Sequence, residues 1–229
     1  MTITDNLRII GERIRAAEQR YGREPNSVKL IAVSKHQPLT AIQEALQTQQ
    51  YAFGENYVQE MQEKALALAL NDSCIEWHFI GPIQTNKTRP IAELATWVHS
   101  IDRLKVAQRL NDQRPSQLAP LQVCIQVNLS EEASKSGVAF YEAEALAHQI
   151  KTLDRLQLRG LMAIPAPSKD VAVQRQVFRR LRELKDQLNQ QSFKLDTLSM
   201  GMTDDMEAAI AEGATQVRIG TAIFGARNY

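Results

Sequence analysis

Lys35 is the first residue of the chain whose type and position indicate covalent chemistry. It follows the run Leu30-Ile31-Ala32-Val33-Ser34, which has the length and the Ile/Val content of a β-strand, and Pro38 then favours the start of a helix. A lysine held at the end of a strand can form a Schiff base with a carbonyl compound. It can equally extend its charged end into solvent from an apolar surface. The sequence around Lys35 alone leaves both interpretations open.

Glycine and hydroxyl residues late in the chain indicate a second kind of chemistry, phosphate binding. Ser199 and Gly201 follow one apolar run, and Gly220 and Thr221 follow another. Glycine lets backbone N–H groups approach a phosphate closely, and the hydroxyls add donors. Tight turns that need glycine would show the same residues, so each pair alone is a weak signal. Arg218, two residues before Gly220, is suited to a ligand contact or to an ion pair.

These residues occur at regular places in an alternating pattern of strands and helices. Eight apolar segments read as strands, and each is followed by a helical or turn element. The expected strands are 29–35, 51–54, 75–80, 96–101, 121–129, 156–164, 195–200 and 216–219. The expected helices are 38–47, 55–70, 86–94, 102–112, 140–153, 171–190, 203–212 and 221–224. One more amphipathic helix precedes them, with Thr4 or Asp5 as its cap and Gly22 after its end.

Eight alternating units in 229 residues predict the α/β fold class, as a single (β/α)8 TIM barrel with an extra N-terminal helix. We expect one domain over 1–229, with the helix in 1–22 and the barrel in 29–229. A doubly wound open sheet is the alternative, but the chain has no G-x-G-x-x-G or G-x-x-x-x-G-K motif. In a barrel the carboxyl ends of the strands converge, so Lys35 becomes a neighbour of the residues after the last two strands.

That arrangement suits pyridoxal 5'-phosphate (PLP). Its aldehyde would bond Lys35, its phosphate would lie on the glycine and hydroxyl residues after the last two strands, and Arg218 would donate to the pyridine nitrogen. Because arginine does not give up its proton, that nitrogen would remain unprotonated. The cofactor would then be a weaker electron sink than one paired with an aspartate.

Composition and charge exclude several other classes of function. Lys and Arg number 27 against 26 Asp and Glu, and the formal net charge of +1 gives no electrostatic reason to expect nucleic acid or an anionic membrane as partner. The two cysteines, Cys74 and Cys124, have no metal-type spacing. No segment approaches the ~20 apolar residues of a membrane span, and the N-terminus has no apolar signal core. We expect a cytoplasmic monomer.

Other titratable residues are weaker candidates for a site. His78 and His99 follow neighbouring strands, but no carboxylate or cysteine at ligand spacing accompanies them, which favours hydrogen bonding over metal. Glu55 suits acid–base work or a helix N-terminus. Lys135, in a polar segment, is either a second aldehyde acceptor or a solvated loop lysine. We therefore expect no metal site and assign no catalytic residue.

A resemblance to a known family lies in the segments Ala32-Val33-Ser34-Lys35, Phe53-Gly54-Glu55-Asn56, Trp77-His78-Phe79-Ile80-Gly81-Pro82, Ser199-Met200-Gly201-Met202 and Val217-Arg218-Ile219-Gly220, among others. Through these segments the chain resembles the YggS/PROSC family of pyridoxal-phosphate homeostasis proteins along nearly its whole length. This resemblance implies the barrel of fold-type III PLP proteins, similar to the N-terminal domain of alanine racemase. It implies PLP held as an aldimine on Lys35, Arg218 at the ring nitrogen and Asn56 near the ring. Family members often carry a second lysine where this chain has Gln37.

Three functions follow from these observations. The first, favoured by the resemblance, is intracellular PLP homeostasis, in which the protein buffers the cofactor or hands it to PLP-dependent apo-enzymes without turning over an amino acid. The second is an amino-acid racemase of the alanine racemase type, which would need a base on each face of the ring; only Lys35 is evident, and we expect no second domain to supply the other. The third is a Schiff-base aldolase acting on a phosphosugar, which would bind no chromophore.

Overall fold

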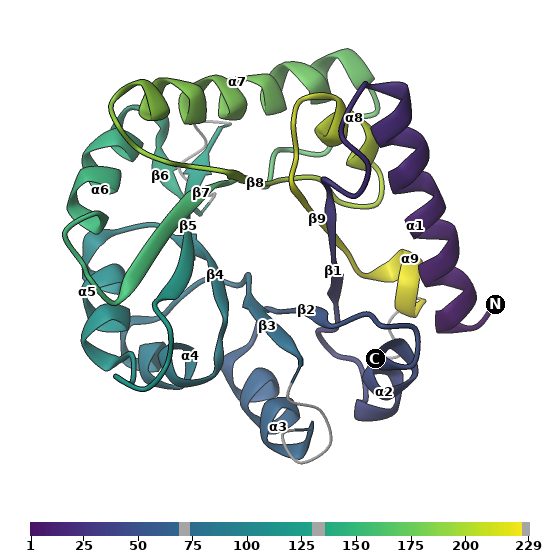
Figure 1. Cartoon of the computed structure of the whole chain (residues 1–229), viewed down its shortest axis with the longest axis horizontal. Coiled ribbons are helices and arrows are strands. Elements are labelled where there is room, and N and C mark those ends of the chain that lie inside the picture. Colours follow the sequence, from purple (N-terminus) through teal and green to yellow (C-terminus); the bar gives the residue numbers. More distant parts are fainter. Residues whose placement is uncertain (69–73, 130–135, 226–229) are drawn as a thin grey trace.

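Eight parallel strands close into a barrel in the computed structural model, which describes residues 1–68, 74–129 and 136–225. The strand order is β1, β2, β3, β4, β5, β7, β8, β9, and β9 returns to pair with β1 (Figure 1). A two-residue strand, β6, pairs with the end of β5. The predicted (β/α)8 barrel is confirmed. The strands are β1 Lys29–Val33, β2 Ala52–Glu55, β3 Glu76–Phe79, β4 Trp97–Ile101, β5 Leu121–Asn128, β6 Val138–Ala139, β7 Leu156–Met162, β8 Thr197–Ser199 and β9 Gln216–Ile219.

Helices surround the barrel and bury their apolar faces against it (Figure 1). The long α7 runs along one side of the barrel, and α1 lies beside α8 and α9. The α-helices are α1 Ile3–Arg20, α2 Leu39–Leu46, α3 Val58–Leu68, α4 Thr88–Leu94, α5 Leu104–Gln113, α6 Ala143–Ile150, α7 Val171–Gln190, α8 Met206–Ala211 and α9 Thr221–Phe224, and two short 3-10 helices cover Thr85–Lys87 and Phe140–Glu142. Among the residues described, no helix is long and apolar enough to cross a membrane.

The helix boundaries differ from the sequence prediction where side chains make local hydrogen bonds. Helix α1 is capped by Thr2 rather than Thr4, and Asp5 completes a capping box as the third helical residue. Helix α3 begins at Val58 and not at Glu55, because Glu55 is the last, fully buried residue of β2. In α1 the predicted apolar face is buried, from Leu7 to Ala17.

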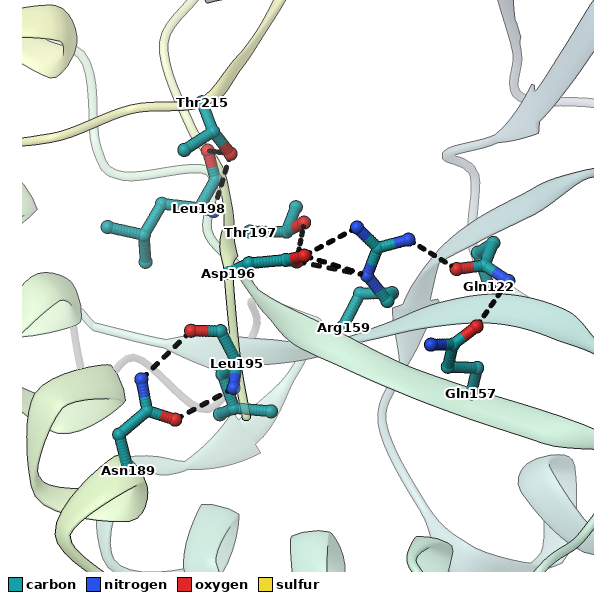
Figure 2. A network of polar contacts seen from close by, with 9 residues as sticks. All are labelled: Gln122, Gln157, Arg159, Asn189, Leu195, Asp196, Thr197, Leu198 and Thr215. Atoms are coloured by element: carbon teal, nitrogen blue, oxygen red, sulfur yellow. Dashed lines mark hydrogen bonds and ion pairs between the residues drawn. The ribbon is translucent and has the colours of Figure 1, made fainter. Parts of the chain in front are cut away.

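The opening ends of β5, β7 and β8 are joined by a polar network centred on Arg159 (Figure 2). Arg159 Nε donates to Asp196 Oδ1 at 3.0 Å, and its Nη1 donates to Gln122 Oε1 at 2.6 Å. Next along β7, Gly160 lies so close to β8 that a Cβ there would stand 1.8 Å from the Thr197 carbonyl oxygen. These contacts set the register between β5, β7 and β8, and β8 ends at Ser199, one of the predicted site residues.

Candidate functional site

Five of the seven residues predicted to bind a cofactor line one cavity of about 190 Å³. They are Lys35, Asn56, Arg218, Gly220 and Thr221. They come from the carboxyl ends of β1, β2 and β9, which are neighbours in the barrel. The chain thus brings an amine, a guanidinium, an amide and a hydroxyl together at one cavity. The other lining residues are Val33, Gln37, Ile80, Ile164, Met202, Thr203 and Gly225.

Strand pairing accounts for the positions of Lys35 and Arg218. Strand β1 pairs with β9 so that Ile31 faces Arg218, and Lys35 follows the end of β1 by two residues. Gly220 packs against the same strand, because a Cβ there would stand 3.2 Å from the Val33 carbonyl oxygen. The close approach of β9 to β1 therefore brings the residues after the last strand to the side of the cavity that Lys35 lines.

Arg218 is a buried cation whose guanidinium is held by two acceptors. Its Nη1 donates to Ser199 Oγ at 2.6 Å, and its Nη2 donates to the Ala163 carbonyl at 2.9 Å. Its backbone N–H donates to the Gly201 carbonyl at 3.0 Å. Burial lowers the pKa of Arg218 to about 10, although the Asp205 carboxylate opposes this shift. The guanidinium therefore stays charged at neutral pH and can donate to a ligand in the cavity.

Behind Arg218 a chain of hydrogen bonds crosses the barrel interior. Ser199 Oγ lies 2.7 Å from His99 Nδ1, and His99 Nε2 lies 3.0 Å from His78 Nδ1. Ser199 is on β8 and His99 on β4, two strands that are not neighbours in the sheet, so their contact spans the inside of the barrel. His78 Nε2 then lies 3.4 Å from Glu76 Oε2, a close polar contact that lacks the alignment of a hydrogen bond.

The direction of this chain follows from the chemistry of its members. Arginine can only donate, so Ser199 Oγ accepts from Arg218 and its own O–H donates to His99 Nδ1. His99 then donates from Nε2 to His78, which turns its remaining N–H toward Glu76. Burial lowers the pKa of both histidines, and His78 and Arg218 lower that of His99 further. Two neutral imidazoles with one N–H each agree with this direction.

The remaining two predicted residues, Ser199 and Gly201, do not line the cavity. Both contact Arg218, Ser199 through its hydroxyl and Gly201 through its carbonyl. Gly201 has φ +97°, and a Cβ there would stand 2.6 Å from the Ala209 side chain, so the turn itself needs glycine. Their direct contact with a phosphate stays a prediction.

Two residues that line the cavity were not predicted from the sequence to bind the cofactor. Met202 and Thr203 line the cavity, although the sequence assigned phosphate binding to their neighbours.

His78 and His99 hydrogen-bond to each other, the role that the sequence analysis favoured over metal binding. Within the described ranges no group of three or more His, Cys, Asp or Glu residues is placed to share a metal ion. Lys135 lies outside the described residues.

The donors at the cavity fit a phosphorylated aldehyde. The Asn56 Oδ1 atom is buried and has no hydrogen-bond partner among the described residues, which leaves this amide available to a ligand. The lining offers an amine for a carbonyl carbon, a cation for an aromatic nitrogen, and a glycine–threonine pair for a phosphate. PLP carries the aldehyde, the nitrogen and the phosphate in one molecule.

Comparison with known proteins defines the class. The family described as "Alanine racemase, N-terminal domain" matches residues 6–228. The chain therefore belongs to the alanine racemase N-terminal-domain family, within which it groups with pyridoxal phosphate homeostasis proteins. It is 58% identical over 228 residues to the pyridoxal phosphate homeostasis protein of Pseudomonas aeruginosa, covering 100% of this chain and 97% of that one. It is 52% identical to the protein of the same name from Escherichia coli strain K12, covering 99% of this chain and 97% of that one.

Solved structures agree with this grouping. PipY of Synechococcus elongatus, in the structure with PLP bound, is 37% identical and has a TM-score of 0.81, covering 94% of this chain and 100% of that one. An alanine racemase of Clostridium difficile has a TM-score of 0.75 at 14% identity, covering 96% of this chain and 56% of that one. The second likeness concerns the barrel fold alone.

Proposed function

We propose that this protein binds pyridoxal 5'-phosphate at the cavity lined by Lys35 and Arg218 and acts in PLP homeostasis. The observation that carries this proposal is the meeting of Lys35, Asn56, Arg218, Gly220 and Thr221 at one cavity. Relatives at 52–58% identity are named for this function, and the structure of PipY contains PLP. In this proposal the protein stores the cofactor or hands it to PLP-dependent apo-enzymes, as a cytoplasmic monomer.

Bound PLP would supply an aldehyde carbon, the kind of group with which a lysine amine bonds. Lys35 would hold the cofactor covalently. Arg218, charged and held by Ser199 and Ala163, donates to the ring nitrogen and keeps it unprotonated. Asn56 bonds a polar group of the ring. Gly220 and Thr221 bind the phosphate, and Ser199 and Gly201 contribute by holding Arg218.

We propose that the protein does not turn over amino acids. Racemisation at PLP needs a proton donor or acceptor on each face of the ring. Lys35 can serve one face, and no second base is evident among the other polar residues that line the cavity. An arginine at the ring nitrogen also makes PLP a weaker electron sink than an acid would. Amino-acid racemisation remains the alternative, because the matched family takes its name from alanine racemase.

A single preparation tests these statements. The purified protein should be yellow, and borohydride should bleach it and attach the cofactor to Lys35, as mapped by mass spectrometry. A colourless protein with no adduct at Lys35 would contradict PLP binding. L-amino acids incubated with the protein are expected to keep their optical rotation. A loss of optical rotation would favour the racemase.

The assignment of Arg218 has its own test. Arg218→Ala should retain PLP at least about tenfold more weakly, because a hydrogen bond to a charged group is lost. His148→Ala, a change on the outer helix α6, should retain it as the unaltered protein does. Equal retention by the two variants would show that Arg218 does not hold the cofactor.

A further inference from the structure

Lys64 is a buried lysine close to the Lys35 segment in space but remote from it in sequence. It lies on α3, and its amine donates to three acceptors: the Ser34 carbonyl at 2.8 Å, Glu55 Oε1 at 2.8 Å and Glu60 Oε2 at 3.1 Å. An ammonium group has three hydrogens, so all three donors are used. A buried ammonium is costly unless it is paired in this way.

The two carboxylates around Lys64 also hold both neighbours of Lys35. Glu55 Oε1 accepts from the Ser34 hydroxyl at 2.6 Å. Glu60 Oε2 accepts from the His36 backbone N–H at 2.7 Å, and Glu60 Oε1 lies 3.1 Å from His36 Nδ1. Burial raises the pKa of Glu55, while the charge and hydrogen bond of Lys64 oppose the shift. The residues before and after Lys35 are therefore both tied to one charge cluster, in which Lys64 and Glu55 are buried and Glu60 is partly exposed.

This cluster holds a turn that is strained at the residue after Lys35. The His36 backbone has φ +61°, in the left-handed region, and the Gln37 N–H donates to the Ser34 carbonyl at 3.0 Å to close the turn. Without contacts that hold it, a non-glycine residue populates this conformation about 5 to 150 times less than a relaxed backbone conformation. The double contact of Glu60 with His36, and the Lys64 hydrogen bond to Ser34, oppose that relaxation.

We propose that Lys64, together with Glu55 and Glu60, is a positioning residue for Lys35. The cluster holds the turn from Ser34 to Gln37 in the conformation that presents the Lys35 side chain to the cavity. This inference rests on the proposed role of Lys35 as the residue that bonds PLP. Glu55 acts here as a buried partner of Lys64 and Ser34 rather than as an acid–base group.

Two neighbouring carboxylates on α3 provide a matched test. Glu60→Ala removes both contacts with His36 and the one with Lys64, whereas Glu63→Ala removes an exposed carboxylate of the same helix that accepts a hydrogen bond from Gln59. Both variants lose one negative charge and gain a good helix former. Lys64→Met is the third variant, and Glu60→Ala decides the question if Lys64→Met does not fold.

The measurement is the rate at which the full chain, freed of cofactor, bonds PLP at Lys35, trapped with borohydride and quantified by mass spectrometry. Glu60→Ala and Lys64→Met should react roughly tenfold more slowly, within the population factor of the left-handed turn. Glu63→Ala should stay within about twofold of the unaltered protein. The visible circular dichroism of bound PLP should change in the first two variants only, which a loss of overall stability would not produce at a temperature where all are folded.

Rates and spectra that are unchanged in Glu60→Ala and Lys64→Met would overturn the positioning role. If the unaltered protein itself does not bond PLP at Lys35, the proposed function fails and the positioning role is judged separately. Acetylation of Lys35 by acetic anhydride, measured against other lysines, then serves as the readout. A rate altered by Glu60→Ala but not by Glu63→Ala supports the positioning role, and equal rates refute it.

Discussion

Replacing Ser199 with alanine tests whether this residue acts on the cofactor directly or through Arg218. The change removes one hydroxyl that accepts from Arg218 at 2.6 Å and lies 2.7 Å from His99. Both partners are buried and stay without a substitute. A hydrogen bond to a charged group contributes about 1.5–3 kcal/mol and a neutral one about 1 kcal/mol. We expect Ser199→Ala to lower the free energy of unfolding by about 3 kcal/mol.

The stability assay is urea unfolding of the cofactor-free protein. For a chain of this size the expected loss corresponds to a decrease in Tm of about 6–12 °C. The control is Ser116→Ala, at an exposed serine, which should change the free energy of unfolding by less than about 0.5 kcal/mol. A Ser199→Ala variant as stable as this control would show that the Ser199 hydroxyl does not hold Arg218 and His99.

The binding assay compares PLP with pyridoxal, which has the same ring and aldehyde but no phosphate. If Ser199 acts through Arg218, Ser199→Ala should weaken both ligands by the same factor, about tenfold, because the ring contact is affected. Thr221→Val should weaken PLP and leave pyridoxal unchanged, because its hydroxyl is assigned to the phosphate. A loss confined to PLP in Ser199→Ala would refute the reasoning and place Ser199 on the phosphate.

Three further changes test the frame of the barrel. The pKa of Glu76 is lowered to about 2, mainly by its contact with His78, so the stability that this carboxylate contributes is present above about pH 4.5 and lost as pH falls toward 2. Glu76→Gln should lower the free energy of unfolding in urea by about 1 kcal/mol at pH 6 and by almost nothing near pH 2. The expected loss is smaller than the full pKa shift implies because the carboxylate is partly exposed. Burial would raise the pKa of Glu212, but hydrogen bonds from arginines of α7 outweigh this effect and lower that pKa. Glu212→Gln should therefore lower the free energy of unfolding by about 1–2 kcal/mol at pH 7 and by less at pH 3. A loss that is the same at both pH values would contradict the ion pairs. Gly160→Ala should lower it by more than about 3 kcal/mol, because the new Cβ meets the Thr197 carbonyl, whereas Gly22→Ala, with open space around it, should cost about 1 kcal/mol; similar losses would mean that β7 and β8 can separate without cost.

The strands were predictable because each is a short apolar run between turn signals, and local pattern carries that information. The boundary at Glu55 was not. A carboxylate reads as the first turn of a helix, and its burial in β2 depends on Lys64, nine residues later. Likewise, Tyr57 lies in the segment 55–70 that was predicted to be helical, but it precedes α3, is half-exposed and makes a tilted ring contact with His36. In both cases a contact between side chains of separate elements outweighed the local pattern.

The meeting of Lys35 and Arg218 was also predictable, because closure of the barrel pairs the first and last strands. The contact between Ser199 and His99 was not, because it joins residues 100 positions apart on strands that are not neighbours. To predict such a contact, one would need to know the diameter of the barrel interior and the rotamers of the side chains inside it. The alternating pattern of the sequence contains neither.

The two cationic residues at the cavity are thus held from behind by two separate polar networks. Arg218 is held by β8 and, through it, by β4 and β3, while the turn of Lys35 is held by β2 and α3. All of these contacts join groups of the protein itself, and a site whose side chains are held in this way needs few groups to be ordered on binding, which favours affinity. Such preorganisation suits a protein that repeatedly takes up and releases one cofactor. It also explains why exchanges at residues that do not line the cavity, such as Lys64 or Ser199, are expected to change its binding.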